Sequence, residues 1–387
     1  HSNVLDIENS GMVEVSGTVH LGEVTNHETG TIRLTTESSL LCFDGTLTND
    51  GGITGTGSVT FRGTTLGAGY IALAGARSTI TYDAASEEAQ QKFYATDKDG
   101  NYIYNAKVII RGKGEVHINR DMTFNKGLSL DGGNLVVDEG YTLNVATVEL
   151  LSGTLTVQAG AVLESANDLI FSTALKLVNN GTVRLLDGSS VTFAGVTEGS
   201  GTLDMSGGDI TYSGSEQYLY AIVGEFGNMV LSGGMKHVGF DLDLSNSVLT
   251  NNGADITVEK DASLKLGQVN GDSVDYTITV LGALQLGSET TALGKIDNYG
   301  KVDLSIAAGK MVTLQGLSNR LGGSVNVVTA GTLTVNGDGN NAGILQITTS
   351  DGGTVRFSGA LDNSGSLDLS GIANSITFGG TLTTTGT

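Results

Sequence analysis

The sequence predicts an all-β protein built as a parallel β-helix, or β-solenoid, with one looped and partly helical insertion. Three observations lead to this prediction. Glycine is abundant while proline is absent, a short glycine-led unit with alternating apolar residues recurs along the chain, and an asparagine stands just before many of these glycines. Together they indicate many short strands joined by tight corners.

The composition excludes several other classes of protein. The 387 residues include 58 glycines, no proline and no tryptophan, whereas average usage would give about 27 glycines and about 19 prolines. Collagen, proline-rich linkers and most disordered segments raise both residues together, so none of them fits. An apolar fraction of 39% is enough for a hydrophobic core.

Charge and cysteine content limit the partners. With 20 basic and 41 acidic residues the formal charge is −21, which repels phosphate backbones, so we expect no nucleic-acid partner. No apolar run approaches ~18 residues, so we expect no direct membrane insertion of this segment. The single cysteine, Cys42, cannot close an internal disulfide and is expected to be a small buried hydrophobe.

The recurring unit is a glycine, a small or polar residue, and then an apolar–x–apolar triplet. Examples are residues 11–15, 114–118, 153–157, 181–185, 331–335 and 365–369. Alternation with period two predicts short, half-buried strands, in which Val183 and Leu185 point inward and Arg184 points outward.

The corners are marked by asparagine, as at Asn180, Asn298 and Asn363, and the whole unit repeats at a spacing such as the 22 residues from Gly343 to Gly365. Both asparagine and glycine tolerate left-handed backbone angles, and the spacing suits one coil of a parallel β-helix. The alternative is a β-sandwich or a string of immunoglobulin-like modules, but these usually carry turn prolines, a core tryptophan and a disulfide. We therefore expect a single solenoid over residues 1–387 that is a fragment of a longer chain, because both ends interrupt the pattern.

Residues 70–111 break the glycine spacing and hold five of the eleven tyrosines. Within this insertion residues 86–94 are expected to be helical, with Ser86 as N-cap and acidic residues in the first turn. The candidate binding residues are Tyr82, Tyr94, Tyr102 and Tyr104. Tyrosine suits a recognition surface because it offers apolar area together with a hydroxyl group. The alternative is that these rings only pack the segment onto the coil.

The Asn-x-Gly-x-apolar-x-apolar units, as in residues 179–193, cover most of residues 1–70 and 110–387. In this they resemble the passenger domains of Gram-negative autotransporters and related filamentous-haemagglutinin-like β-helix surface adhesins. The resemblance implies right-handed coiling, secretion to the bacterial cell surface and, commonly, adhesion or self-association.

Enzymatic activity is not expected. Polysaccharide-degrading β-helices cluster charged side chains on one face, whereas Glu14, Asp204, Asp303 and Asp368 are scattered singly along the sequence. No cofactor and no metal site is predicted. Calcium is left open at the oxygen-rich loops 97–101 and 337–341, which lack the bidentate glutamate of an EF-hand. The histidines show no metal-binding spacing; they are His1, His20, His27, His117 and His237.

The function expected from these observations is that of a secreted bacterial surface protein with a structural or adhesive role, a rigid β-helical stalk. Its partners would be a glycan or protein on a host or neighbouring cell, or a second copy of itself. Two alternatives remain open. One is a self-assembling filament, sheath or surface-layer subunit, and the other is a β-helical polysaccharide-degrading enzyme with three or more charged side chains stacked in one cleft.

Overall fold

The computed structural model describes residues 5–271, 273–287 and 292–387. Within these residues the regular secondary structure is β-strand, and no α-helix is present. The chain divides into two compact units, unit 1 of residues 1–207 and 223–225 and unit 2 of residues 208–222 and 226–387. A single solenoid over the whole chain stays a prediction.

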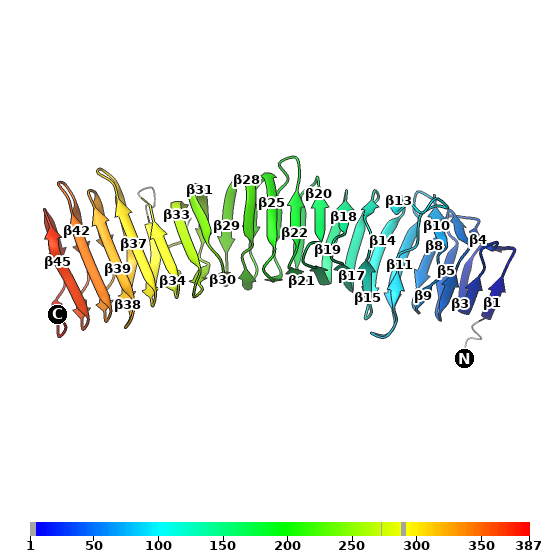
Figure 1. Ribbon diagram of the computed structural model, residues 1–387, viewed down its shortest axis with the longest axis horizontal. Helices are drawn as coiled ribbons and strands as arrows, with labels where there is room; N and C mark the ends of the chain where they lie inside the picture. The colour runs from blue at the N-terminus through cyan, green and yellow to red at the C-terminus, as the bar shows by residue number, and fades with distance from the viewer. Residues whose placement is uncertain (1–4, 272, 288–291) are drawn as a thin grey trace. The chain divides into compact units, whose positions relative to one another are not determined.

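Each unit is a parallel β-solenoid with three tracks of strands (Figure 1). Along a track, the chain returns one coil later and pairs in parallel with the strand that it left. Neighbouring strands of such a ladder lie ~4.8 Å apart. The predicted all-β parallel solenoid is therefore confirmed.

The strands of unit 1 are given by track. The first track has two runs: β2 (Met12–Val15), β4 (Thr31–Leu34), β7 (Gly52–Gly55) and β10 (Tyr70–Leu73), then β13 (Ile103–Tyr104), β16 (Met122–Phe124), β18 (Thr142–Val145), β20 (Val162–Ser165), β22 (Thr182–Leu185) and β25 (Thr202–Gly207). The second contains β5 (Leu40–Phe43), β8 (Ser58–Phe61), β11 (Thr79–Ala84), β14 (Lys107–Gly112) and β23 (Val191–Phe193). The third contains β1 (Leu5–Asn9), β6 (Leu47–Asn49), β9 (Thr65–Leu66), β12 (Gln91–Lys92), β15 (Glu115–Ile118) and β24 (Val196–Glu198). Four longer strands run from the second track into the third: β3 (Thr18–Asn26), β17 (Leu128–Val137), β19 (Val148–Val157) and β21 (Leu169–Asn179).

Unit 2 has three tracks of its own. One contains β35 (Ala283–Leu286), β37 (Lys301–Ile306), β39 (Ser324–Thr329), β42 (Ile344–Thr349) and β45 (Ser366–Ile372). Another contains β26 (Ile210–Tyr212), β29 (Asn228–Ser232), β40 (Thr332–Val335), β43 (Thr354–Phe357) and β46 (Ser375–Phe378). The last contains β27 (Glu216–Tyr218), β30 (Met235–Val238), β32 (Asp255–Val258), β34 (Thr277–Val280), β41 (Gly339–Asn341), β44 (Leu361–Asn363) and β47 (Leu382–Thr384). Strands that bend from one track into the next are β31 (Leu242–Asn252), β33 (Ser263–Asn270), β36 (Ala292–Asn298) and β38 (Met311–Asn319).

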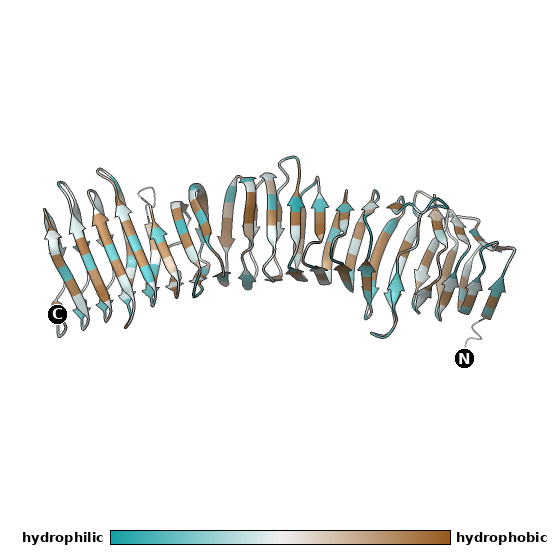
Figure 2. Cartoon of the chain, viewed as in Figure 1, coloured by the Kyte–Doolittle hydropathy of each residue, from teal (hydrophilic) through white to brown (hydrophobic). Residues whose placement is uncertain are grey.

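The inward and outward positions follow the predicted alternation, and Figure 2 shows apolar and polar bands alternating along the strands. Val183 and Leu185 are fully buried, and Val183 lies beside Leu203 of the next coil. Arg184, between them, points outward and is half-buried. Cys42 is buried, as expected. Inward side chains of one coil pack on the inward side chains of the next, so each unit has a continuous apolar core.

At the corners glycine adopts left-handed backbone angles as predicted, for example at Gly140 (φ 82°) and Gly160 (φ 77°), but no described asparagine does. Within the described residues the non-glycine positions with positive φ are Asp187 and Asp261, and no asparagine is among them. The corner asparagines instead turn inward and bond to one another, as when Asn26 Nδ2 donates to Asn49 Oδ1 over 2.7 Å. Other glycines, such as Gly343, are needed for space, because a Cβ on Gly343 would lie 2.2 Å from the carbonyl oxygen of Gly323.

The prediction of a partly helical insertion at residues 70–111 is wrong. The segment contains strands β10 to β14, and β11 pairs in parallel with both β8 and β14. Residues 86–94 form a turn followed by extended chain, in which Gln91 and Phe93 are buried and Lys92 between them is not. Core packing at every second residue favours a strand over the helix that local propensity predicts. What leaves the coil is two short loops, residues 85–90 and 96–102.

Candidate functional site

Three of the four predicted tyrosines belong to an aromatic column in the core of unit 1. Tyr82, Tyr94 and Tyr104 are 0%, 2% and 1% exposed. The ring of Tyr82 lies 4.8 Å from that of Phe93, and the ring of Tyr104 stacks 5.0 Å from that of Phe124. Such pairs add to the stability that burial of the rings provides. These three side chains are buried and pack against other rings in the core of unit 1.

The hydroxyl groups of Tyr94 and Tyr104 find hydrogen-bond partners inside the core, whereas the Tyr82 hydroxyl has none among the described residues. The Tyr94 hydroxyl donates to the carbonyl oxygen of Leu66 over 2.6 Å, and the Tyr104 hydroxyl donates to the carbonyl oxygen of Tyr94. Burial raises the pKa of both hydroxyl groups because the phenolate would lose its hydration. Of the four predicted residues, Tyr102 is the half-exposed one.

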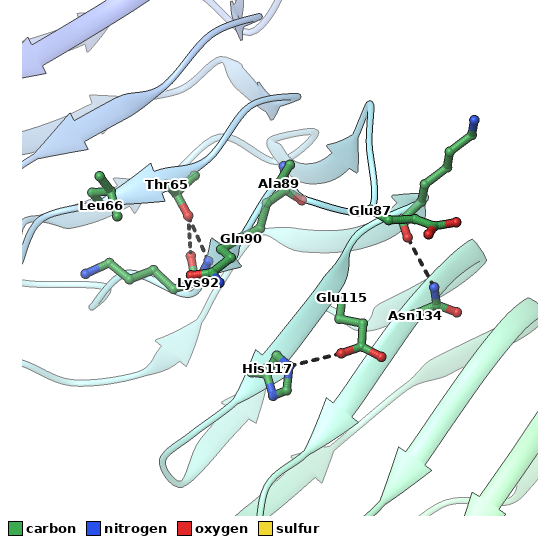
Figure 3. Close-up of a pocket in the computed structure, with 11 residues that line it drawn as sticks. Thr65, Leu66, Glu87, Ala89, Gln90, Lys92, Glu115, His117 and Asn134 are labelled. Atoms are coloured by element: carbon green, nitrogen blue, oxygen red, sulfur yellow. Dashed lines mark hydrogen bonds and ion pairs between the residues drawn. The ribbon is translucent and has the colours of Figure 1, made fainter.

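The loop 85–90 forms one wall of a pocket of about 620 Å³, which we call the Lys113 pocket (Figure 3). Its lining includes Lys92, Lys113, Glu115, His117 and Asn134. Glu115 and His117 project from the same face of β15, because they are two residues apart on a strand. The pocket therefore forms where the loop stands over an outward-facing strand.

The charges of the Lys113 pocket are partly paired. His117 Nδ1 lies 2.8 Å from Asp138 Oδ1, and His117 Nε2 lies 3.4 Å from Glu115 Oε2. Lys92 Nζ donates to the carbonyl oxygen of Gly67, and partial burial lowers the pKa of Lys92. The ammonium of Lys113 forms no ion pair with any described residue and is exposed. It remains available to a carboxylate, hydroxyl or carbonyl group of a partner.

A second hollow, of about 610 Å³, lies against the loop 96–102, and we call it the Tyr102 groove. Its lining includes Tyr102, Ile103, Asp121, Asn144, Glu164 and Arg184. The guanidinium of Arg120 lies 4.2 Å from the centroid of the Tyr102 ring and donates to the Tyr102 hydroxyl. Loop 96–102 therefore places one predicted residue in a surface groove.

Charged residues that are far apart in sequence meet in this groove. Arg184 donates to Glu164 Oε2 over 3.2 Å and to Asp204 Oδ2 over 2.8 Å. These hydrogen bonds raise the pKa of the Arg184 guanidinium. Asp204 is thus not isolated, contrary to the sequence interpretation. The three residues stand 20 apart, so aligning the chain at that period would have revealed the row.

In the two loops where calcium was left open, carboxylate oxygens accept hydrogen bonds from the backbone. In loop 97–101 Asp97 Oδ1 accepts the backbone N–H groups of Asp99 and Asn101, each over 3.0 Å. In loop 337–341 Asp338 Oδ1 accepts the Ala360 N–H over 2.8 Å. The described residues contain no group of three or more His, Cys, Asp or Glu placed to hold a metal ion. His1 lies outside the described residues.

None of the described residues forms a helix that is long and apolar enough to cross a membrane. Comparison with known proteins finds one similarity by sequence. The chain is 29% identical over 179 residues to the autotransporter adhesin/invasin TibA of Escherichia coli O78:H11, strain H10407 / ETEC. The matched part is 45% of this chain and 17% of TibA, so the similarity spans less than a fifth of that protein. No family model matches the chain, and no solved structure does. The similarity and the β-solenoid together support the predicted resemblance to autotransporter passengers: the chain is like a β-helical adhesin passenger.

Proposed function

We propose that this protein is a secreted or surface-exposed bacterial β-solenoid that attaches its cell to another surface, with the Lys113 pocket beneath loop 85–90 as the attachment site. The distant similarity to an autotransporter adhesin supports a surface role of adhesive or structural kind. The proposal itself comprises the adhesive activity and its partner. It also includes the right-handed coiling that the resemblance implies.

The observation that carries the choice of this site is the concave shape of the Lys113 pocket. A solenoid coil buries its apolar residues inside and leaves a nearly flat ladder of polar side chains outside. Loop 85–90 breaks this regularity and creates a concave, polar surface. Concave sites with a few convergent polar groups are where ligands bind most often. The unpaired Lys113 adds a cation on a chain whose formal charge is −21, which favours a partner with carboxylate, hydroxyl or carbonyl groups.

The test uses beads coated with the full chain, which are applied to cultured epithelial cells and, separately, mixed with one another. Lys113→Ala combined with Glu115→Ala should reduce attachment at least about tenfold if the pocket supplies the anchoring contacts. A hydrogen bond to a charged group contributes about 1.5–3 kcal/mol, and a loss of about 1.4 kcal/mol lowers affinity tenfold. Lys260→Ala is the matched control, because Lys260 is an exposed lysine of unit 2.

Equal attachment of the wild type, the pocket variant and the control would contradict the proposed role of the pocket. Clumping of the beads that the pocket variant abolishes would identify a second copy as the partner. Polymerisation of the purified chain into filaments, with no other surface present, would favour the alternative of an assembly subunit.

We also propose that the role is not enzymatic. In the Tyr102 groove Arg184 pairs with both Glu164 and Asp204, so neither carboxylate of the row is free of a cationic partner. A carboxylate pair for glycoside hydrolysis would need one member protonated and both directed at the substrate. New reducing ends released from a polysaccharide by the purified chain would contradict this proposal.

A further inference from the structure

The Tyr102 groove has a regular floor that runs along the axis of unit 1. Its residues follow one another as backbone partners on adjacent strands of the first track. In order they are Ile103, Thr123, Asn144, Glu164 and Arg184, and the same row continues to Asp204 just beyond the groove lining. Adjacent members are therefore ~4.8 Å apart. The groove offers one outward side chain per coil in a straight line.

The polar members of this row hold one another in place. Asn144 Nδ2 donates to Glu164 Oε1 over 3.0 Å, and Arg184 bridges Glu164 and Asp204. Each group keeps hydrogen-bonding capacity beyond these contacts: the second N–H and the carbonyl oxygen of Asn144, further N–H groups of Arg184 and free lone pairs of both carboxylates. The floor thus presents alternating donors and acceptors that need little reordering when they bind a ligand.

The end of the groove at loop 96–102 is apolar and is held rigidly. Ile103 is 47% exposed, and the Tyr102 ring beside it is fixed by the contact with Arg120. The loop itself is tied together by Asp97, whose Oδ2 accepts from Asn101 Nδ2 over 2.6 Å. These hydrogen bonds lower the pKa of Asp97, so the carboxylate that organises the loop stays ionised. An aromatic and an aliphatic side chain are therefore presented next to a polar row.

We infer that the Tyr102 groove binds a linear, uncharged glycan that lies along the axis of unit 1, with about one sugar residue for each coil. A sugar ring has apolar C–H faces, which match Tyr102 and Ile103, and hydroxyl groups that both donate and accept, which match the row from Asn144 to Asp204. Glu164 and Asp204 disfavour a polyanionic glycan, as does the chain's formal charge of −21.

This inference is independent of the proposed role of the Lys113 pocket. The two hollows are formed by different loops, 85–90 and 96–102, and are lined by different residues. The chain can bind an oligosaccharide in the Tyr102 groove whether or not the Lys113 pocket mediates attachment. A negative bead-attachment result for the Lys113 pocket would therefore not contradict glycan binding in the Tyr102 groove. The reverse also holds.

The experiment is calorimetric titration of the full chain with cellohexaose, xylohexaose and maltohexaose, and with a heparin hexasaccharide as the polyanionic comparison. We expect at least one neutral hexasaccharide to bind with a millimolar or lower Kd, and the heparin fragment to bind more weakly. Tyr102→Ala and Asn144→Ala should each weaken binding about tenfold or more. Tyr102→Phe keeps the ring and should retain most of the affinity.

Gln346→Ala is the matched control. Gln346 is also an outward amide that donates to a carboxylate on the next coil, Asp368, but it lies in unit 2. This variant should bind like the wild type. The inference is overturned if no neutral hexasaccharide binds, if the heparin fragment binds best, or if the Tyr102 and Asn144 variants bind as well as the control.

Discussion

The side chain of Asn319 donates a hydrogen bond of 2.7 Å to the side chain of Asn341, one coil further along unit 2. Asn319 also accepts from Asn298 Nδ2 over 2.9 Å, and Asn341 donates to Asn363 Oδ1 over 2.6 Å. All four amides are buried at the same corner of successive coils. Each amide satisfies its neighbour, so a polar column runs through the interior without unpaired groups.

We predict that Asn319→Ala lowers the free energy of unfolding by about 2–3 kcal/mol, because it takes the donor away from the buried Asn341 Oδ1 and from the carbonyl oxygen of Ile344. Urea denaturation followed by circular dichroism measures the change. Asn326→Ala is the control, since Asn326 is outward and half-buried, with one long hydrogen bond of 3.4 Å to Asp303. Equal loss in both variants would show that the column does not stabilise the coil.

Val183→Asp should destabilise unit 1 by several kcal/mol. Val183 is fully buried, and an unpaired carboxylate in the core loses its hydration without compensation. Arg184→Gln, one residue away, should cost about 1 kcal/mol or less, because Arg184 pairs with its partners at the surface. Thermal unfolding of both variants compares the two positions, and similar costs would contradict the assigned inward and outward register.

The free energy of unfolding of unit 2 should increase as the pH rises above about 8, because the buried Lys236 then loses its charge. Its side chain is buried, with Nζ donating to the carbonyl oxygens of Gly214 and Gly233 over 2.6 Å each. Burial lowers the pKa of Lys236 from 10.5 to about 8. Between these two pH values the unfolded chain binds more protons than the folded chain, so raising the pH favours folding. At about 1.4 kcal/mol for each pKa unit, the penalty below pH 8 is on the order of 3 kcal/mol.

The measurement is the urea midpoint between pH 7.5 and 9.5, for wild type and Lys236→Met. Lys236 lies beside Ile256 in the core ladder, so methionine fits the apolar surroundings. The midpoint of the wild type should rise with pH, while that of Lys236→Met should start higher and change less. A wild-type midpoint that falls over this range would contradict the prediction.

Above pH 10 the buried tyrosines should lower the free energy of unfolding as the pH rises, the opposite of the effect of Lys236. Burial raises the pKa of Tyr104 above its ordinary value of 10.0. Above pH 10 the unfolded chain therefore releases protons that the folded chain retains, and stability falls as the pH rises. Tyr104→Phe keeps the ring stack on Phe124 and should show a smaller fall between pH 9.5 and 11. Tyr141→Phe, at a ring that is 37% exposed, is the control, and an equal slope in the two variants would exclude Tyr104 as a cause.

The sequence by itself determined the class of fold. Period-two alternation, glycine at the corners and the absence of proline follow from local backbone chemistry, and they placed residues such as Val183 and Arg184 on the correct faces. The predicted resemblance to autotransporter passengers rested on the same repeated units. These features could be predicted because each coil repeats the same local requirement.

The tertiary structure decided what the repeats alone could not. Residues 86–94 have the composition of a helix, but Phe93 and Gln91 are held in the core by contacts with residues about 30 positions earlier or later, such as the Gln91 amide on the carbonyl oxygen of Phe61 over 2.8 Å. For the same reason Tyr82, Tyr94 and Tyr104 went into an aromatic column, while Tyr102 stayed at the surface. The row of Asn144, Glu164, Arg184 and Asp204 exists only because parallel coiling brings every twentieth residue side by side, which converts scattered charges into one groove.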